Sequence, residues 1–346
     1  MNVGITYDLR DDYLKLGYSP EQAAEFDSEE TIQAIDAALA ELGYGTERIG
    51  GVRRLTELLA AGRRWDIVFN IAEGMYGAGR EAQVPALLDA YRIPYTFSDP
   101  LVLCLTLDKA LAKQAVRAAG LATPDHRIIQ DEAELSNWDM AFPVFAKPLR
   151  EGTGKGVDAS SLVRNQLALR GVVSRLLHHF GPVLVESYLP GREFTVGVVG
   201  AGASARSVGV MEIHLLNGAD AGCYTQRNKE DCASLVRYDL AFDEQAQAAA
   251  DLAVSCYRVL GCRDAGRVDV RLDAQGRPHF LEVNPLAGLH PTHSDLPILW
   301  SLGGGRYLQL IRSIMDAAMT RRRVEDECWG GVNSIRPARP AAGTRL

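Results

Sequence analysis

The chain of 346 residues is too long for one simple core and predicts two or three domains. Its net charge of −7 argues against a general nucleic-acid surface, no apolar run approaches the ~18 residues of a membrane span, and the start MNVGITYDLR lacks the pattern of a secretory signal. The six cysteines form no Cys-x-x-Cys pair, so we expect a reduced, cytoplasmic protein in which neither zinc nor redox chemistry is indicated.

Strands and helices alternate through the first hundred residues. Residues 2–7 are typical of a strand, and residues 28–42 have the apolar spacing of a helix that ends at Gly43. The fully apolar run DIVFN, residues 66–70, is typical of a buried parallel strand. This alternation predicts a doubly wound α/β domain over residues 1–100.

The loop that follows the DIVFN strand, NIAEGMYGAGREAQ, contains three glycines and Arg80. Because ligands bind at the carboxyl ends of strands in open α/β sheets, this loop is a candidate substrate wall. A flexible connection into the helix over residues 80–91 explains it equally well. No GxGxxG pattern follows the first strand, so a dinucleotide site has little support.

Two lysines and a glycine-rich segment mark the middle of the chain. Lys109 opens a helix, and Lys147 ends the apolar strand FPVFAKP, where its charge is costly unless it meets an anion or water. The segment EGTGKG, residues 151–156, follows directly, and its backbone N–H groups can wrap phosphates. The spacing is not that of a P-loop, and a glycine-rich turn alone is more often a hairpin. Lys147 at short range favours phosphate.

The segment PVLVESYLPGREFTV places one acid at the exit of each of two strands. Glu186 ends the first strand and Glu193 lies on the second. Such a segment can serve the edge of an adenine and the hydroxyls of a ribose. It can equally be a structural turn.

The segment GRVDVRLDAQGRPHFLEVN reads as two strands joined by a Gly/Pro turn. Glu282 and Asn284 project to one face because they are two residues apart in a strand, and hairpin pairing can bring Asp269 opposite them. Two carboxylates and an amide oxygen suit Mg²⁺ bound together with phosphate oxygens. An exposed hairpin with surface acids is the alternative, but the lysines and glycine loop upstream favour the magnesium site.

In their order along the chain these segments resemble the ATP-grasp carboxylate–amine ligases, most closely the D-alanine–D-alanine ligases. The resemblance covers about residues 101–319 and extends weakly over residues 70–98. Its matching segments are DKALAKQAVRAAGL, FPVFAKPLREGTGKGV, VLVESYLPGREFTV, GCRDAGRVDVRLD and LEVNPLAGLHPTHS.

The resemblance implies a mixed α/β and α+β architecture, in which a Rossmann-like (pre-ATP-grasp) α/β domain precedes an ATP-grasp fold. The first domain spans residues 1–100, a central lid subdomain with the glycine loop spans 101–190, and a C-terminal subdomain with the metal site spans 191–320. We expect residues 321–346, which are charged and then rich in Pro, Gly and Ala, to form a flexible tail.

The resemblance also implies a role for each matching residue. Two Mg²⁺ ions, for which Mn²⁺ can substitute, would be held by Asp269, Glu282 and Asn284. Lys147, Thr153 and Arg267 would act in catalysis, with Arg267 stabilising an acyl phosphate and a tetrahedral intermediate. ATP would be bound by Lys109, Lys147, Glu151, Gly152, Gly154, Lys155, Gly156, Glu186, Ser187, Tyr188, Leu189 and Glu193.

The departures from the family pattern fall at the substrate pocket. The Gly-Gly-x-Ser-x-Glu segment after the first strand is missing, and Asp8 is an acid in roughly that place. The family's His-Gly pair is Glu73-Gly74 here, and its EGSS loop is EGTG followed by Lys155. The acceptor loop, GLHPTHS, would place Gly288, His290, His293 and Ser294 near the acceptor amino acid. The two histidines would assist deprotonation of the amine or bind an acceptor group, or they have no special role.

The expected reaction joins a carboxylate to an amine through an acyl phosphate, with amino-acid-like substrates. Because an acyl phosphate hydrolyses in water, the site needs lids, and the glycine loop and residues 216–238 are the candidates. The alternatives are a biosynthetic ligase that uses L-amino, peptide or non-proteinogenic substrates, and a non-catalytic ATP-binding protein. The resemblance makes a homodimer the expected assembly.

Overall fold

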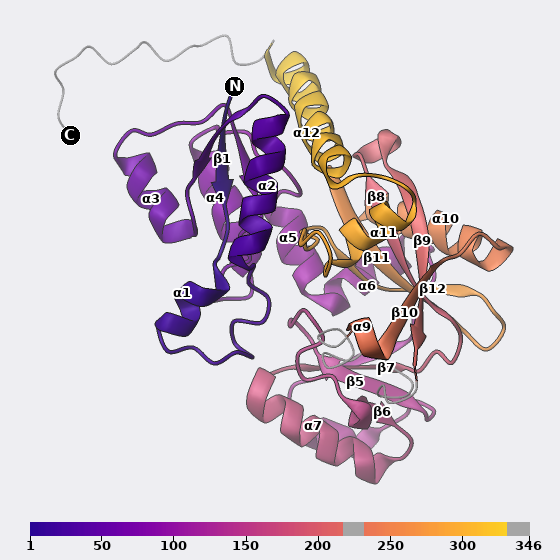
Figure 1. Ribbon diagram of the computed structural model, residues 1–346. Coiled ribbons are helices and arrows are strands. Elements are labelled where there is room, and N and C mark those ends of the chain that lie inside the picture. The colour runs from indigo at the N-terminus through magenta and orange to yellow at the C-terminus, as the bar shows by residue number, and fades with distance from the viewer. Residues whose placement is uncertain (217–231, 331–346) are drawn as a thin grey trace.

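The computed structural model describes residues 1–216 and 232–330, which form three sheets covered by helices (Figure 1). The first sheet is parallel, with strand order β2-β1-β3. All four residues of β3 are buried, which confirms the reading of DIVFN. The Ser28 hydroxyl caps α2 by accepting from the Thr31 N–H at 3.3 Å. The elements are β1 (Asn2–Thr6), α1 (Arg10–Lys15), α2 (Glu29–Glu41), β2 (Gly45–Arg48), α3 (Val52–Ala60), β3 (Ile67–Asn70), the 3₁₀ turn η1 (Arg80–Ala82) and α4 (Gln83–Ala90).

The second sheet is antiparallel, with strand order β4-β7-β5-β6. Helix α7 packs on it through Leu169, Val173 and Leu176, since residues three and four apart share one face of a helix. The elements are β4 (His126–Ile129), η2 (Glu132–Asn137), β5 (Val144–Pro148), η3 (Ala159–Ser161), β6 (Leu162–Val163), α7 (Gln166–Phe180) and β7 (Val183–Ser187).

The third sheet is antiparallel, with strand order β10-β9-β8-β11-β12, and α10 and α11 cover its two faces. The preceding helices α5 and α6, which the sequence analysis assigned to the central subdomain, pack against this sheet through Val102 and Val116. The elements are α5 (Pro100–Leu107), α6 (Lys109–Ala118), β8 (Glu193–Val199), η4 (Gly202–Ser204), β9 (Arg206–Leu215), α9 (Cys232–Leu235), β10 (Val236–Leu240), α10 (Glu244–Val259), β11 (Ala265–Leu272), β12 (Pro278–Asn284), α11 (Asp295–Leu302) and α12 (Tyr307–Gly330).

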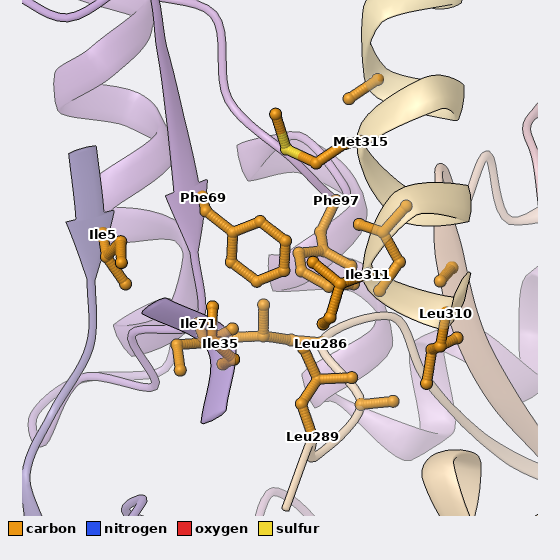
Figure 2. Packing of buried hydrophobic residues seen from close by; sticks show 14 of the residues in the cluster. Ile5, Ile35, Phe69, Ile71, Phe97, Leu286, Leu289, Leu310, Ile311 and Met315 are labelled. Carbon is orange, nitrogen blue, oxygen red and sulfur yellow. The ribbon is translucent and has the colours of Figure 1, made fainter. Parts of the chain in front are cut away.

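Helix α12 returns to the first domain and closes a shared core. Ile311 and Met315 pack against Phe69 and Phe97 from the first domain (Figure 2). The helix continues to Gly330, so a flexible tail beginning at residue 321 is a wrong prediction. Residues 331–346 lie outside the described residues.

The second candidate lid, residues 216–238, is only partly described. Residues 217–231 lie outside the described residues, but residues 236–238 belong to β10 and pair with β9, so this end is part of the sheet. Among the described helices, none is both long enough and apolar enough to cross a membrane.

Candidate active site

A cavity lies between the second and third sheets. Its walls come from β5, β7, the glycine loop and the β11–β12 hairpin. It gathers most of the residues that the sequence analysis assigned to ATP: Lys109, Lys147, Glu151, Gly154, Lys155, Glu186, Ser187, Tyr188, Leu189 and Glu193, together with Asp269 and Glu282.

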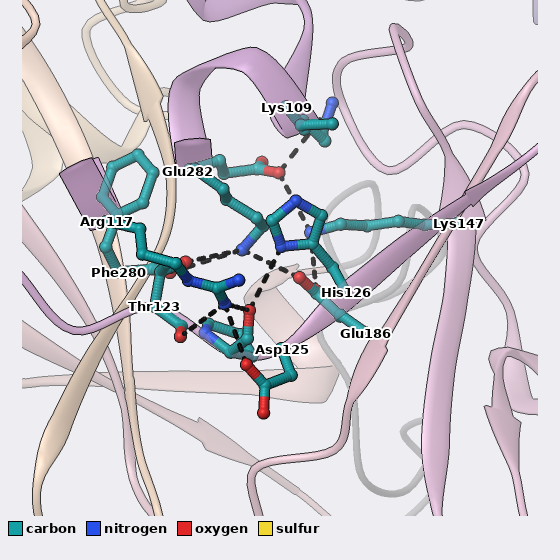
Figure 3. A network of polar contacts seen from close by, with 12 residues as sticks. Lys109, Arg117, Thr123, Asp125, His126, Lys147, Glu186, Phe280 and Glu282 are labelled. Atoms are coloured by element: carbon teal, nitrogen blue, oxygen red, sulfur yellow. Dashed lines mark hydrogen bonds and ion pairs between the residues drawn. The ribbon is translucent and has the colours of Figure 1, made fainter. Parts of the chain in front are cut away.

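Lys147 is held between two carboxylates. Its Nζ lies 3.1 Å from Glu186 Oε1 and 3.4 Å from Glu282 Oε2 (Figure 3). Burial opposes the charge of Lys147, yet the attraction of Glu186 and Glu282 raises its pKa. Lys109 also approaches Glu282, at 3.9 Å, and burial lowers the pKa of its ammonium. Both lysines therefore direct positive charge at one end of the cavity.

Lys113 is a member of this cluster that the sequence analysis missed. It is fully buried, and its Nζ lies 2.8 Å from Glu186 Oε2. Burial lowers the pKa of Lys113 to about 8 against the pull of Glu186. Burial of Glu186 would raise its pKa, but Lys113 and Lys147 together lower it. Glu186 thus positions two lysines. Lys113 stands four residues after Lys109 on one helix, so helical spacing could have revealed it.

The β11–β12 hairpin aligns the predicted metal ligands. Asp269 pairs directly with Glu282 across the ladder, and Arg267 pairs with Asn284. The Thr195 hydroxyl donates to Asp269 Oδ1 at 2.9 Å, and Arg267 Nη1 donates to Asp269 Oδ2 at 2.9 Å. Within the described residues no group of three or more His, Cys, Asp or Glu is arranged to hold a metal. A cation here would need phosphate oxygens besides Asp269, Glu282 and the Asn284 amide.

Arg267 is fixed by its neighbours. Its Nη1 lies 3.0 Å from Asp295 Oδ2, and the guanidinium side chain is only 11% exposed. With its amide oxygen turned toward Arg267, Asn284 accepts from the Nε at 2.9 Å. Asp295, at the start of α11, is another residue that the sequence analysis missed.

A third missed residue, Arg271, lies on the far side of the first cavity. Its Nη1 donates to Glu193 Oε2 at 2.9 Å, and its Nη2 donates to the Tyr188 hydroxyl at 3.1 Å. These bonds orient two of the residues assigned to ATP. Arg271 lies four residues after Arg267 on the same strand face as Asp269, a period-two signal that the sequence contains.

The glycine loop is closed against the first domain by Glu25. Glu25 Oε1 accepts from the Gly152 N–H at 2.7 Å and lies 3.4 Å from Lys155 Nζ, while Arg80 donates to Oε2 at 3.0 Å. Burial would raise the pKa of Glu25, but Arg80 and Lys155 lower it. Gly156 has a φ of +70°, and a Cβ there would lie 2.7 Å from Phe180, so the loop requires glycine.

A second, more open cavity of about 1540 Å³ adjoins the first. The two are lined by neighbouring residues of the same segments: Glu151 and Gly154 face the first cavity, and Gly152 and Thr153 face the second. The β11–β12 hairpin is divided in the same way, because Asp269 and Glu282 line the first cavity and Arg267 and Asn284 line the second. The second cavity gathers Glu73, Gly152, Thr153, Arg267, Asn284, Gly288, His290, His293 and Ser294.

The acceptor loop is ordered by its own serine. Ser294 Oγ accepts from the His290 N–H at 3.0 Å, and a Cβ at Gly288 would lie 2.7 Å from this oxygen, so glycine is needed there. His290 Nε2 lies 3.4 Å from Glu30 Oε2. The ring centroids of His290 and His293 are 4.6 Å apart.

The structure does not bring Asp8 to this cavity. Asp8 is buried and accepts from the Tyr13 hydroxyl at 2.7 Å and from the Gly74 N–H at 2.8 Å. The first-domain acids on the cavity are instead Glu25, Asp27, Glu30, Glu73 and Glu81. Asp8 orders the loop that presents Glu73.

Comparison with known proteins agrees with this geometry. Residues 115–316 match the family model described as D-ala D-ala ligase C-terminus. The chain is 34% identical over 273 residues to the D-alanine--D-alanine ligase of Bordetella petrii, covering 78% of this chain and 80% of that protein. It is 32% identical over 302 residues to a Sinorhizobium fredii protein, y4sG, covering 83% and 87% of the two chains.

A solved structure shows the same fold. The D-alanine--D-alanine ligase of Bacillus anthracis, crystallised with ATP, superposes with a TM-score of 0.69 at 21% identity and covers 94% of this chain and 99% of its own. The chain therefore belongs to the D-alanine–D-alanine ligase family and is an ATP-dependent carboxylate–amine ligase of the ATP-grasp fold.

Proposed function

We propose that this enzyme activates the carboxylate of one amino acid with ATP and joins it to the amine of a second. One observation supports this most strongly: the glycine loop and the β11–β12 hairpin line both cavities, so a nucleotide in one and amino acids in the other meet at these two segments. Lys109 and Lys147 would bind the phosphates. Arg267, held by Asp269 and Asp295, would face the reacting carboxylate.

In the first step a carboxylate oxygen attacks the γ-phosphorus and ADP leaves. In the second step the amine attacks the acyl carbon, inorganic phosphate leaves, and the amine loses a proton. Negative charge grows on oxygens in both steps, so catalysis rests on positioning and positive charge. Arg267 supplies both, because its ion pairs fix the guanidinium.

A metal fits the donor set of the hairpin, which consists of two carboxylates and one amide oxygen on paired strands. Asp269, Glu282 and Asn284 would hold Mg²⁺, two ions in the proposal, with Mn²⁺ as a substitute. When bound, the metal neutralises phosphate charge. We also propose a homodimer, which the family resemblance implies, and a cytoplasmic location, which the cysteine pattern favours. Light scattering of the purified protein tests the first.

ADP release in the presence of D- and L-amino acids, with products identified by mass spectrometry, tests the proposal. Turnover that requires D-alanine alone identifies a D-alanine–D-alanine ligase. Turnover with another pair but none with D-alanine identifies the second candidate, a biosynthetic ligase with other substrates, which the acids on the second cavity favour. If ADP release stays at background with every amino acid, the proposed reaction is wrong and a non-catalytic ATP-binding role is favoured instead.

A further inference from the structure

Three carboxylates on the first-domain wall of the second cavity lack an ion pair. Asp27 precedes α2, Glu73 follows β3, and Glu81 lies in η1. Among the described residues, none of the three has a Lys, Arg or His partner within ion-pair distance. The neighbouring Glu25 differs, since it forms ion pairs with both Arg80 and Lys155.

The surroundings of these carboxylates oppose their negative charge. Burial raises the pKa of all three, to about 7 for Asp27 and for Glu81. Repulsion adds to this: Glu81, Glu25 and Asp27 raise the pKa of Glu73, and Asp8 raises that of Asp27. Arg80 offsets part of the effect at Glu81 and at Glu73, but its guanidinium is already paired with Glu25, and Lys109 offsets a smaller part at Glu81.

The cations that line the same cavity are Arg10, Arg267, His290 and His293, and among the described residues none of them forms an ion pair with the three acids. Arg267 is engaged by Asp269 and Asp295 on the hairpin side. His290 faces Glu30. Arg10, on α1, has no ion pair with any described residue and can receive a carboxylate. Within residues 1–216 and 232–330, a ligand therefore meets one guanidinium and three carboxylates that have no ion-pair partner.

The chemistry of alanine does not match this wall. An alanine zwitterion brings one ammonium, which can neutralise one carboxylate, whereas three carboxylates here have no ion-pair partner in the part of the chain that the structure describes. An extra cation on the ligand would relieve the repulsion, because opposite charges at close range favour the ionised carboxylates.

We propose that this subsite takes a diamino acid, an amino acid whose side chain ends in a second amine, and that Asp27, Glu73 and Glu81 select it. The proposal rests on the proposed function, because it names the substrate class of the same site. The side-chain ammonium would lie against the three carboxylates, and Arg10 would be available for a substrate carboxylate.

Matched substrates test the proposal. ADP release is measured at saturating ATP and Mg²⁺ with lysine and norleucine, which have similar length but differ in the terminal amine, and with ornithine and alanine, in both enantiomers. We expect the KM of the preferred diamino acid to be at least about tenfold below that of its neutral counterpart, as one well-placed charge contact of ~1.4 kcal/mol provides.

The Glu73→Gln/Glu81→Gln double variant should reduce this preference to about twofold or less, since amides keep the shape and lose the charge. Circular dichroism checks its fold. Glu41→Gln, at an exposed glutamate at the end of α2, is the matched control and should keep the full preference.

Calorimetric binding with a non-hydrolysable ATP analogue separates the proposal from the function on which it rests. Alanine ligation with no preference for diamino acids, in rate or in binding, overturns the proposal and leaves the ligase function intact. Preferential diamino-acid binding without any ATP turnover supports the subsite and refutes the ligase function. A double variant that keeps the wild-type preference overturns the assignment of the selecting residues.

Discussion

Glu282 lies beside both lysines of the first cavity and beside the predicted metal ligand Asp269. It approaches Lys109 and Lys147 and pairs across the hairpin with Asp269. We expect Glu282→Gln to lower the rate of amide formation by about 100-fold or more, because the amide removes the charge that would hold the metal against the phosphates. Stability should change little, since Gln keeps the shape of this partly exposed side chain.

Coupled ADP and product assays on the purified variant measure this effect, with thermal unfolding as the check on the fold. Glu132→Gln, at an exposed glutamate of the capped turn η2, is the control and should retain wild-type turnover. Full turnover by Glu282→Gln would show that the metal assignment is mistaken.

Residue-scale prediction succeeded where chemistry and local pattern coincide. Asp269 and Glu282 lie on two strands joined by one turn, so a hairpin was expected to bring them opposite each other, and the structure confirms that pairing. Glu25 was missed because its partner Gly152 is 127 residues away and neither lies in a motif that names the other. Asp8 was predicted to be a substrate residue because it follows the first strand. Its hydrogen bonds with Tyr13 and Gly74 keep it out of the cavity.

Elements were predictable where a cap or a period specifies them. Ser28 and Asp108 cap α2 and α6 as their sequences indicate. The prediction of a flexible arm failed at the segment RRRVEDE, residues 321–327. Its charges suggest a solvated arm, but the structure pairs one of them, that of Arg321, with a buried acid. Composition cannot report a partner that lies far away in the sequence.

That partner is Asp264, which is fully buried and lies 2.9 Å from Arg321 Nη2; the same nitrogen donates to the Tyr95 carbonyl at 2.8 Å. Burial raises the pKa of Asp264, and Arg321 works against that rise. Arg321→Ala should therefore lower the free energy of unfolding by roughly 3 kcal/mol, because it leaves a buried carboxylate without its cation. Urea unfolding measures the change. The neighbouring Arg323→Ala, at an exposed arginine, should cost under about 0.5 kcal/mol, and equal effects in the two variants would contradict this role for α12.

At the scale of the whole molecule, the unpaired acids on the second cavity couple stability to pH. A carboxyl whose pKa is higher in the folded state binds more protons there than in the unfolded chain, so stability falls as pH rises from its unfolded value through its folded value. For Asp27 that window runs from 3.8 to about 7. Groups such as Glu186, with lowered pKa values, act in the opposite direction, and their contribution to stability is lost as pH falls below the unfolded value of 4.5.

Asp27→Asn isolates this effect. Since Asn carries no charge at any pH, the free energy of unfolding of the variant relative to that of the wild type should rise by on the order of 2–3 kcal/mol from pH 5 to pH 8, at about 1.4 kcal/mol per pKa unit. Urea midpoints from pH 5 to 8 measure the difference, and Asp11→Asn, at an exposed aspartate of α1, should run parallel to the wild type. If Asp27→Asn also runs parallel, the carboxylate is already compensated. If the difference in free energy of unfolding grows with pH, the carboxylates are ionised at pH 8 and lack a cation. A diamino acid that supplies this cation should then stabilise the wild type more at pH 8 than at pH 5, because only ionised carboxylates attract its ammonium.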